Sequence, residues 1–221
     1  MKRKLIWLAV FAVAMAYLEA IVVVYLRELY YPDNILSLFP MRLFRTSDFI
    51  LELGREAATM LMILSVAMLA ERKNFVRIFA AFVYVMGVWD IFYYIWLKVA
   101  IGWPVAWGEW DILFLIPTVW LGPWLCPALI ALLFAAWGGW ILLSGREFRF
   151  DALAGVLFVA GSLLALASFL QPGLAVYLRG GLAAVQTWLP HGFWWGLYLP
   201  GLALMGAGLW RVTRLPDEET A

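Results

Sequence analysis

The sequence predicts an all-α integral membrane protein, a helical bundle that crosses the bilayer about six times. The chain of 221 residues is 66% apolar and only 14% charged, whereas about a quarter of the residues in ordinary soluble domains are charged. Apolar runs of 18 or more residues recur along it, and each is long enough to cross about 30 Å of hydrocarbon. We therefore expect a single transmembrane helical domain over residues 1–215 and a short polar cytoplasmic tail at 216–221.

The first helix is expected at 5–25, where a basic start precedes a long apolar stretch. The same features also fit a secretory signal, but we expect a retained helix. Further spans are expected near 49–70, 76–98, 152–170 and 191–211, with a longer fourth segment over 112–143.

The fourth segment is too long for one straight crossing and contains Pro117, Gly122, Pro123 and Pro127. Because proline removes a helical donor and clashes with the preceding turn, we expect a proline-broken segment. It would consist of a short helix or re-entrant piece at about 112–122, then a spanning helix from about 126.

Residues 173–189 are expected to form an interfacial helix on the outer side. Arg179 and Gln186 lie seven apart, on one helical face, and Gly180 and Gly181 interrupt the segment. A seventh crossing there would turn Arg211 and Arg214 outward.

Orientation follows from the placement of lysine and arginine, which accumulate on the cytoplasmic side. With six spans, ten of the 16 basic residues fall on the side of both termini. The other six are Arg27, Arg42, Arg45, Arg55, Lys98 and Arg179. Both termini are therefore expected in the cytoplasm.

Acidic side chains gather in the outer half of the predicted bundle. Glu52, Glu56 and Thr59 recur at i, i+4 and i+7, which is one stripe of a helix. Arg55 borders that stripe. The other candidates are Glu19 on the first helix, Asp90, Tyr93 and Tyr94 on the third, and Asp111 at the outer start of the fourth segment.

A charge near mid-helix costs roughly 2.5–3.5 kcal/mol on insertion scales, so these groups should face one another or a cavity. One interpretation is a structural ion-pair network of Arg55 with Glu52 and Glu19. The four carboxylates at membrane depth outnumber its one arginine, however, so a cation or a proton could complete the site. Oxygen ligands suit a hard divalent cation, which Glu52, Glu56 and Asp90 would hold.

Other functions are excluded by composition. The net charge of +1 provides no basic face for nucleic acid. The single cysteine, Cys126, rules out an internal disulfide and a thiolate metal cluster. The single histidine, His191, rules out a bis-histidine haem within this chain, so no haem is expected.

Small residues recur on the last two predicted helices, as Gly161 with Ala165 and Ala203 with Ala207. Such faces allow helices to pack closely in membranes. They could pack the bundle internally, or they could hold a membrane-protein partner or a second copy of the chain.

Four short motifs resemble a pattern in uncharacterised bacterial inner-membrane proteins. They are GREAAT at 54–59, WDIFYY at 89–94, GWP at 102–104 and WDILFLIP at 110–117. The resemblance covers about residues 15–130. It implies a multi-pass protein of the bacterial inner membrane and attaches no established activity.

Three functions remain open from the sequence. The first is an acidic pocket in the outer, periplasmic half of the bilayer that binds a cation or a lipid-like or quinone-like molecule, with or without catalysis. The second is a non-catalytic structural subunit of a membrane complex. The third is a component of a proton or cation pathway. No catalytic residue is assigned.

Overall fold

The computed structural model describes residues 1–72 and 74–215, so the predicted polar tail lies outside the described residues. The described chain is mostly helical. Its helices are α1 (Lys2–Tyr30), α2 (Thr46–Ala70), α3 (Phe75–Ile101), α4 (Leu125–Ser144), α5 (Ala152–Val185) and α6 (Trp195–Val212). Five of these, α1 to α5, are long and apolar enough to cross a membrane. A multi-pass helical bundle is thus supported, with α6 as a shorter, less apolar sixth helix.

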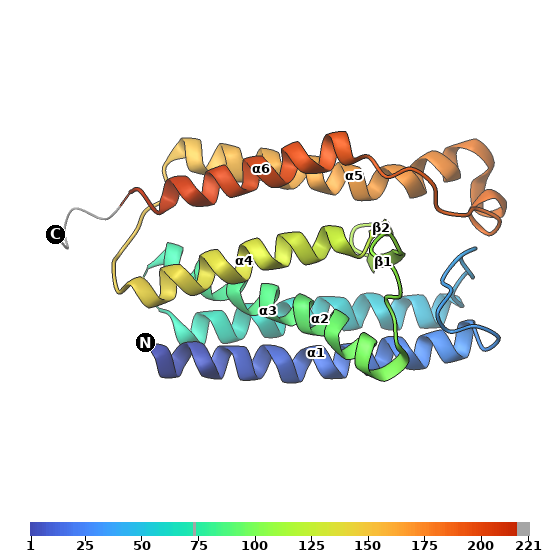
Figure 1. Ribbon diagram of the computed structural model, residues 1–221, viewed down its shortest axis with the longest axis horizontal. Helices are drawn as coiled ribbons and strands as arrows, with labels where there is room; N and C mark the ends of the chain where they lie inside the picture. Colours follow the sequence, from blue (N-terminus) through green and yellow to red (C-terminus); the bar gives the residue numbers. More distant parts are fainter. Residues whose placement is uncertain (73, 216–221) are drawn as a thin grey trace.

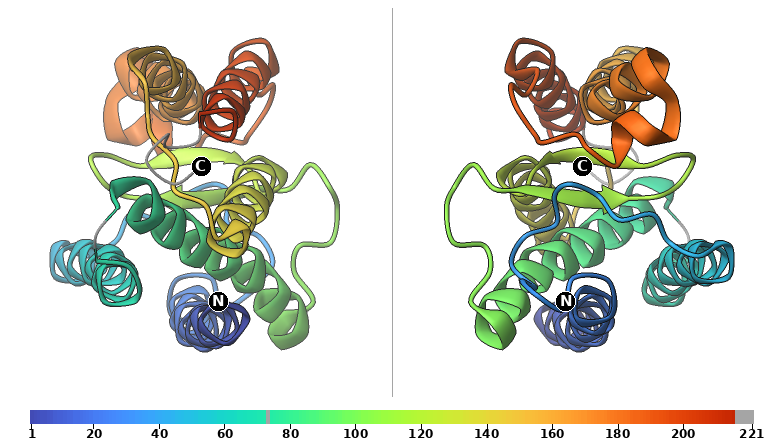
Figure 2. Two further views of the ribbon diagram at one scale, coloured as in Figure 1. Left: turned by 90° about the vertical axis from the view of Figure 1, so that its left-hand side faces the viewer. Right: turned by 90° about the vertical axis from the view of Figure 1, so that its right-hand side faces the viewer.

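The helices lie roughly parallel or antiparallel along one axis, and α1 begins at the end of the bundle where α6 ends (Figure 1). Helix α3 is central and packs against α1, α2 and α4. Helices α5 and α6 form a pair on one side of the molecule (Figure 2), joined to the rest mainly through strand β2 and helix α4. The cavities described below lie around α3.

The expectation of a short helix at 112–122 is wrong, and the chain is not purely α-helical. Strands β1 (Trp110–Phe114) and β2 (Trp120–Pro123) form a two-stranded antiparallel hairpin. Aromatic and β-branched residues favour strands, and the prolines disfavour a helix. Helix α4 starts at Leu125, close to the predicted position, and Pro127 sits in its first turn, where no helical donor is lost.

The predicted end of a helix at residue 170 is wrong, because residues 171–179 continue the same helix, whereas the predicted interruption at Gly180 and Gly181 is present. Helix α5 continues through Pro172, and its backbone leaves helical geometry only at Gly180 and Gly181. Gly181 has a φ of +62°, which only glycine adopts easily. The unbroken part of α5, residues 152–179, corresponds to about 42 Å of helix, more than the hydrocarbon thickness. The end of α5 therefore extends past α4 and α6 (Figure 1).

Glycines set the closest helix contacts. A Cβ atom at Gly161 would lie 2.5 Å from the carbonyl oxygen of Gly201, so α5 and α6 touch backbone to backbone. A Cβ atom at Gly138 on α4 would similarly lie 2.5 Å from the carbonyl oxygen of Ala80 on α3. The Gly161–Ala165 face is thus used inside the bundle, whereas Ala203 and Ala207 are exposed.

Candidate functional site

Arg55 is the centre of the first group of charged side chains. Its guanidinium forms an ion pair with Glu19 of α1 and another with Glu52, 2.8 Å away and one turn earlier on α2. Thr59 donates a hydrogen bond to Glu19 at 3.3 Å. The i, i+3 and i, i+4 spacings bring Glu52, Arg55 and Thr59 to one side of α2, where they meet α1.

Arg27 joins α1 to the hairpin. Its side chain is 2% exposed, and Nη2 lies 3.4 Å from the carboxylate of Asp111 on β1. Tyr94 of α3 donates a hydrogen bond to the other oxygen of Asp111 at 3.4 Å. The guanidinium also lies 4.1 Å from the ring centre of Trp103, a cation–π contact. This pairing was not among the predicted site residues, although Arg27 follows Glu19 by eight residues and so shares its helical face.

Glu56 binds the backbone of the hairpin and not the side chain of an arginine. Its two carboxylate oxygens accept hydrogen bonds from the backbone N–H of Leu115, at 3.0 and 2.9 Å. Beside it lies a small cavity of about 70 Å³, room for about two water molecules. The cavity is lined in part by Arg27, Glu52, Arg55, Glu56, Tyr93 and Asp111.

We call this group the outer ionic network: Glu19, Arg27, Glu52, Arg55, Glu56, Thr59, Tyr94 and Asp111. The structure brings together all the predicted site residues except Asp90, with Tyr93 lining the same small cavity. Each of the four carboxylates of the outer ionic network contacts an arginine or a backbone donor. The ion pairs of Arg55 with Glu19 and Glu52 are those of the ion-pair interpretation, whereas Asp111 pairs with Arg27 and Glu56 accepts hydrogen bonds from a backbone N–H.

Asp90 lies apart from the network, in a cavity of about 300 Å³ between α3, the hairpin and the α5–α6 pair. The hairpin separates the two sites. Asp111 and Leu115 line the small cavity beside Glu56, whereas Leu113 and Phe114 line the Asp90 cavity. The expectation that Asp90 shares one site with Glu52 and Glu56 is therefore not met.

The Asp90 cavity has almost entirely apolar walls. Besides Asp90 and Ser162, its lining side chains are hydrophobic: Met60, Met86, Trp89, Leu113, Phe114, Trp120, Pro127, Ile130, Ala131, Phe134, Ala165, Leu166, Phe169 and Met205. The hydroxyl of Ser162 is used within its own helix, because it donates to the carbonyl oxygen of Phe158 at 2.8 Å. Asp90 is thus the one charged group among the described residues that line this cavity.

Three polar groups at this cavity have no partner within the part of the chain that the structure describes. No hydrogen bond or ion pair joins the carboxylate of Asp90 to another described residue. The indole N–H groups of Trp89 and Trp120 are buried and likewise donate to no described acceptor. The two indole nitrogens have almost no accessible surface, whereas Asp90 is only partly buried. Since buried polar groups in folded proteins are nearly always hydrogen-bonded, the carboxylate of Asp90 is the polar group that this cavity leaves open.

The predicted metal site does not assemble as expected. Over residues 1–72 and 74–215, no three His, Cys, Asp or Glu side chains form a group suited to a metal ion. The physical reason is the hairpin, which places Asp90 in a different cavity from Glu52 and Glu56.

Fold and site together define a helical bundle that fits a multi-pass membrane protein. It has a paired ionic network near one end and a single carboxylate, Asp90, in a separate apolar cavity. Comparison of the chain with protein-family models, with curated proteins and with solved structures finds no match.

Proposed function

We propose that this protein binds a lipid-like or quinone-like molecule from the membrane, and that Asp90 holds the polar group of that molecule. The observation that carries the proposal is the unpartnered carboxylate of Asp90 in an otherwise almost entirely apolar cavity. An isolated carboxyl at membrane depth costs roughly 2.5–3.5 kcal/mol. A ligand that hydrogen-bonds to it would recover much of that cost.

The chemistry of the cavity narrows the ligand class. The carboxyl group of Asp90 can accept a hydrogen bond. A matching polar group therefore carries a hydroxyl or ammonium donor, as quinol rings and lipid headgroups do. A volume of about 300 Å³ lies at the lower end of ligand pockets. It suits one ring or headgroup with part of a chain.

The surroundings proposed for this activity are the bacterial inner membrane, with six crossings and both termini in the cytoplasm. Three observations support this. Ten of the 16 basic residues fall on the side of the termini, α6 with 18 residues is about 27 Å long, and the four short motifs resemble inner-membrane proteins.

The first experiment measures what co-purifies with the protein. Wild type and Asp90→Asn are purified in mild detergent from the same membranes, and bound quinones and lipids are extracted and quantified by mass spectrometry. Losing one charge-assisted hydrogen bond weakens binding by about tenfold or more. We expect wild type to retain one compound near stoichiometry and the variant to retain about a tenth of it.

Two further variants separate binding from general damage. Leu166→Trp fills the cavity and leaves Asp90 intact, so it should also lose the compound. Asp33→Asn removes a carboxylate that is 89% exposed and should retain it. Equal retention by all four proteins would contradict the proposal.

A second candidate, a structural subunit of a membrane complex, is favoured by an unpacked face of α6. Leu199, Ala203, Ala207 and Trp210 follow one another at helical spacing, and all are exposed. Small residues flanked by large ones suit close helix contact with a partner or a second copy. Ala203→Phe should abolish such an assembly in size-exclusion chromatography with light scattering, whereas Leu163→Phe on the exposed face of α5 should not.

A further inference from the structure

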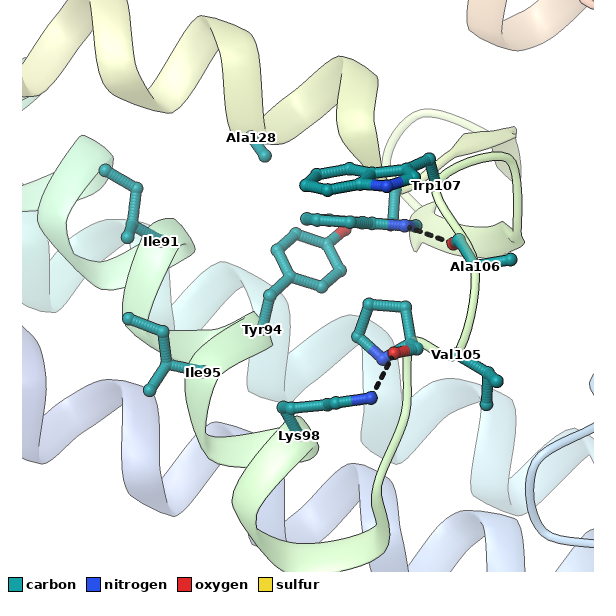
Figure 3. Close-up of a pocket in the computed structure, with 10 residues that line it drawn as sticks. Ile91, Tyr94, Ile95, Lys98, Val105, Ala106, Trp107 and Ala128 are labelled. Carbon is teal, nitrogen blue, oxygen red and sulfur yellow. Dashed lines mark hydrogen bonds between the residues drawn. The ribbon is translucent and has the colours of Figure 1, made fainter.

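A third cavity, distinct from the two described above, lies on the outside of the bundle at the junction of α3, α4 and the segment 104–107. It is a groove of about 440 Å³, and Figure 3 shows the side chains that line it. Lys98 and the ring of Trp107 stand near one end, and Ile91, Ile95 and Ala128 line the rest. We call it the Lys98 groove.

The groove changes in character along the helix axis. Ile91 precedes Lys98 by seven residues on α3, which is about 10 Å of helix. Lys98 is in the last turn of α3, at the end of the bundle that holds the outer ionic network. The charged end of the groove therefore lies near the membrane surface, and its apolar end points towards the middle of the bilayer.

The ammonium group of Lys98 is held in place by two backbone carbonyl groups. Nζ donates to the carbonyl oxygen of Gly102 at 2.9 Å and to that of Pro104 at 2.8 Å. An ammonium has three N–H donors, so one is left for another acceptor. Among residues 1–72 and 74–215, no carboxylate lines the groove. Glu109, two residues after the segment 104–107, accepts a hydrogen bond from the backbone N–H of Val105 at 2.8 Å.

Two tryptophans form the wall beside Lys98. The rings of Trp107 and Trp124 stack with 5.8 Å between centres and 20° between planes. Trp124 is held by a hydrogen bond of 2.9 Å from its indole nitrogen to the carbonyl oxygen of Ala106. Trp107 is 74% exposed, so its outer face is free to cover an apolar group. Tryptophan rings favour the headgroup level of membranes.

We propose that the Lys98 groove binds one anionic phospholipid of the outer leaflet. The phosphate accepts the free N–H of Lys98, the glycerol region lies against Trp107, and one acyl chain follows Ile91, Ile95 and Ala128. Charge complementarity selects the anionic headgroup, and the apolar length of the groove selects a lipid over free phosphate. This site is separate from the Asp90 cavity and does not depend on the function proposed there.

The test is native mass spectrometry of detergent-solubilised protein titrated with phosphatidylglycerol and with phosphatidylcholine of the same chains. One lysine at the membrane surface gives about a fivefold preference for the anionic lipid. We expect wild type and Lys98→Arg to show that preference. Lys98→Gln, which keeps hydrogen-bond donors for the two carbonyls, should bind the two lipids equally.

Controls distinguish this site from a general attraction of anions. Arg179→Gln removes an exposed cation at the same end of the bundle and should leave the preference unchanged. Trp107→Ala should weaken binding of both lipids without altering their ratio. Glycerol phosphate, which has no chains, should not compete. Any one of three results would overturn the proposal. They are a preference for the anionic lipid that Lys98→Gln retains, no such preference in wild type, and competition by glycerol phosphate.

Discussion

Arg27 is an arginine held almost entirely inside the bundle, at 2% exposure. Its guanidinium contacts Asp111 on one side and the ring of Trp103 on the other, while its buried Nε atom has no partner among the described residues. A planar, weakly hydrated guanidinium suits this double contact better than an ammonium does. The side chain thereby ties helix α1 to the hairpin and to the segment after α3.

We expect Arg27→Gln to lower the free energy of unfolding by about 3–5 kcal/mol, because it leaves the buried carboxylate of Asp111 without its ion pair. The measurement is unfolding by SDS titration in mixed micelles. The matched control is Arg42→Gln, whose arginine pairs with Asp33 at the exposed surface and should contribute less than about 1 kcal/mol. Similar losses for the two variants would show that the Arg27 pair does not stabilise the bundle.

For single residues, the sequence predicted which side chains share a helix face better than it predicted which groups those side chains bind. The spacing of Glu52, Glu56 and Thr59 predicted one stripe, and the structure buries all three. The partner of Glu56 was not predictable, because it is a backbone N–H of the hairpin, which carries no signal in side-chain type. Asp90 was grouped with the wrong acids for the same reason: the hairpin that separates them was not expected.

Among the helices and strands, the contact between α5 and α6 has almost no spare room. A Cβ atom at Gly161 would lie 2.5 Å from both the carbonyl oxygen of Gly201 and the backbone nitrogen of Met205. Neither is the tip of a flexible side chain, so the helices themselves would have to move apart. In lipid, such close packing is what holds apolar helices together.

Gly161→Ala should therefore destabilise the protein by about 1–3 kcal/mol, the usual cost of overpacking. Gly155→Ala on the same helix is the control, because no heavy atom lies within 4 Å of its added Cβ. The control should be neutral or stabilise by up to about 1 kcal/mol, since alanine favours helix. Thermal unfolding in detergent, followed by circular dichroism, measures both. The order of the two melting temperatures is the decisive result.

Helix positions were largely predictable because long apolar runs are an unambiguous signal. Helix α3 spans Phe75–Ile101 where 76–98 was expected, and α4 begins within about a residue of its predicted start. The hairpin was not predictable, since a short apolar run such as residues 110–114 fits a strand or a buried helix equally well. The extent of α5 was underestimated because residues 173–189 were assigned to a separate helix. Helix α5 instead continues through Pro172, and membrane helices tolerate proline where neighbours compensate.

For the molecule as a whole, ionic contacts are concentrated at the two ends. The end opposite the outer ionic network has Glu71, just after α2, which accepts hydrogen bonds from Lys4 of α1 and Arg77 of α3. Asp151 caps α5 and pairs with Arg211 of α6. Burial acts to raise the pKa of Glu71, but the hydrogen bonds from Arg77 and Lys4 outweigh it and hold that pKa below its ordinary value. The hydrogen bond from Arg211 lowers the pKa of Asp151.

These lowered pKa values predict that the bundle loses stability in acid. A carboxyl group with a lower pKa in the folded state stabilises the fold above its unfolded pKa of about 4, and this stability is lost as the pH falls through the folded value. We expect the melting temperature to drop between about pH 5 and pH 3.

Glu71→Gln should lower the melting temperature at pH 7 and flatten its decrease in acid. The contribution removed is on the order of 1 kcal/mol, because solvent screens a half-exposed pair. Glu28→Gln replaces an exposed glutamate and should follow the wild-type curve. A melting temperature for Glu71→Gln that falls as steeply as wild type would place the acid sensitivity elsewhere.

The α5–α6 pair is attached to the remaining helices mainly by apolar packing, with few polar contacts. Between the pair and α4, the side-chain hydrogen bonds are Tyr198 to the carbonyl oxygen of Cys126 and Trp137 to that of Leu209. Within residues 1–72 and 74–215, no ion pair links α5 or α6 to α1 to α4. The Asp90 cavity lies across this boundary, so its width depends on how the pair sits. A molecule bound there would touch both sides, and the protein would become stiffer when filled than when empty.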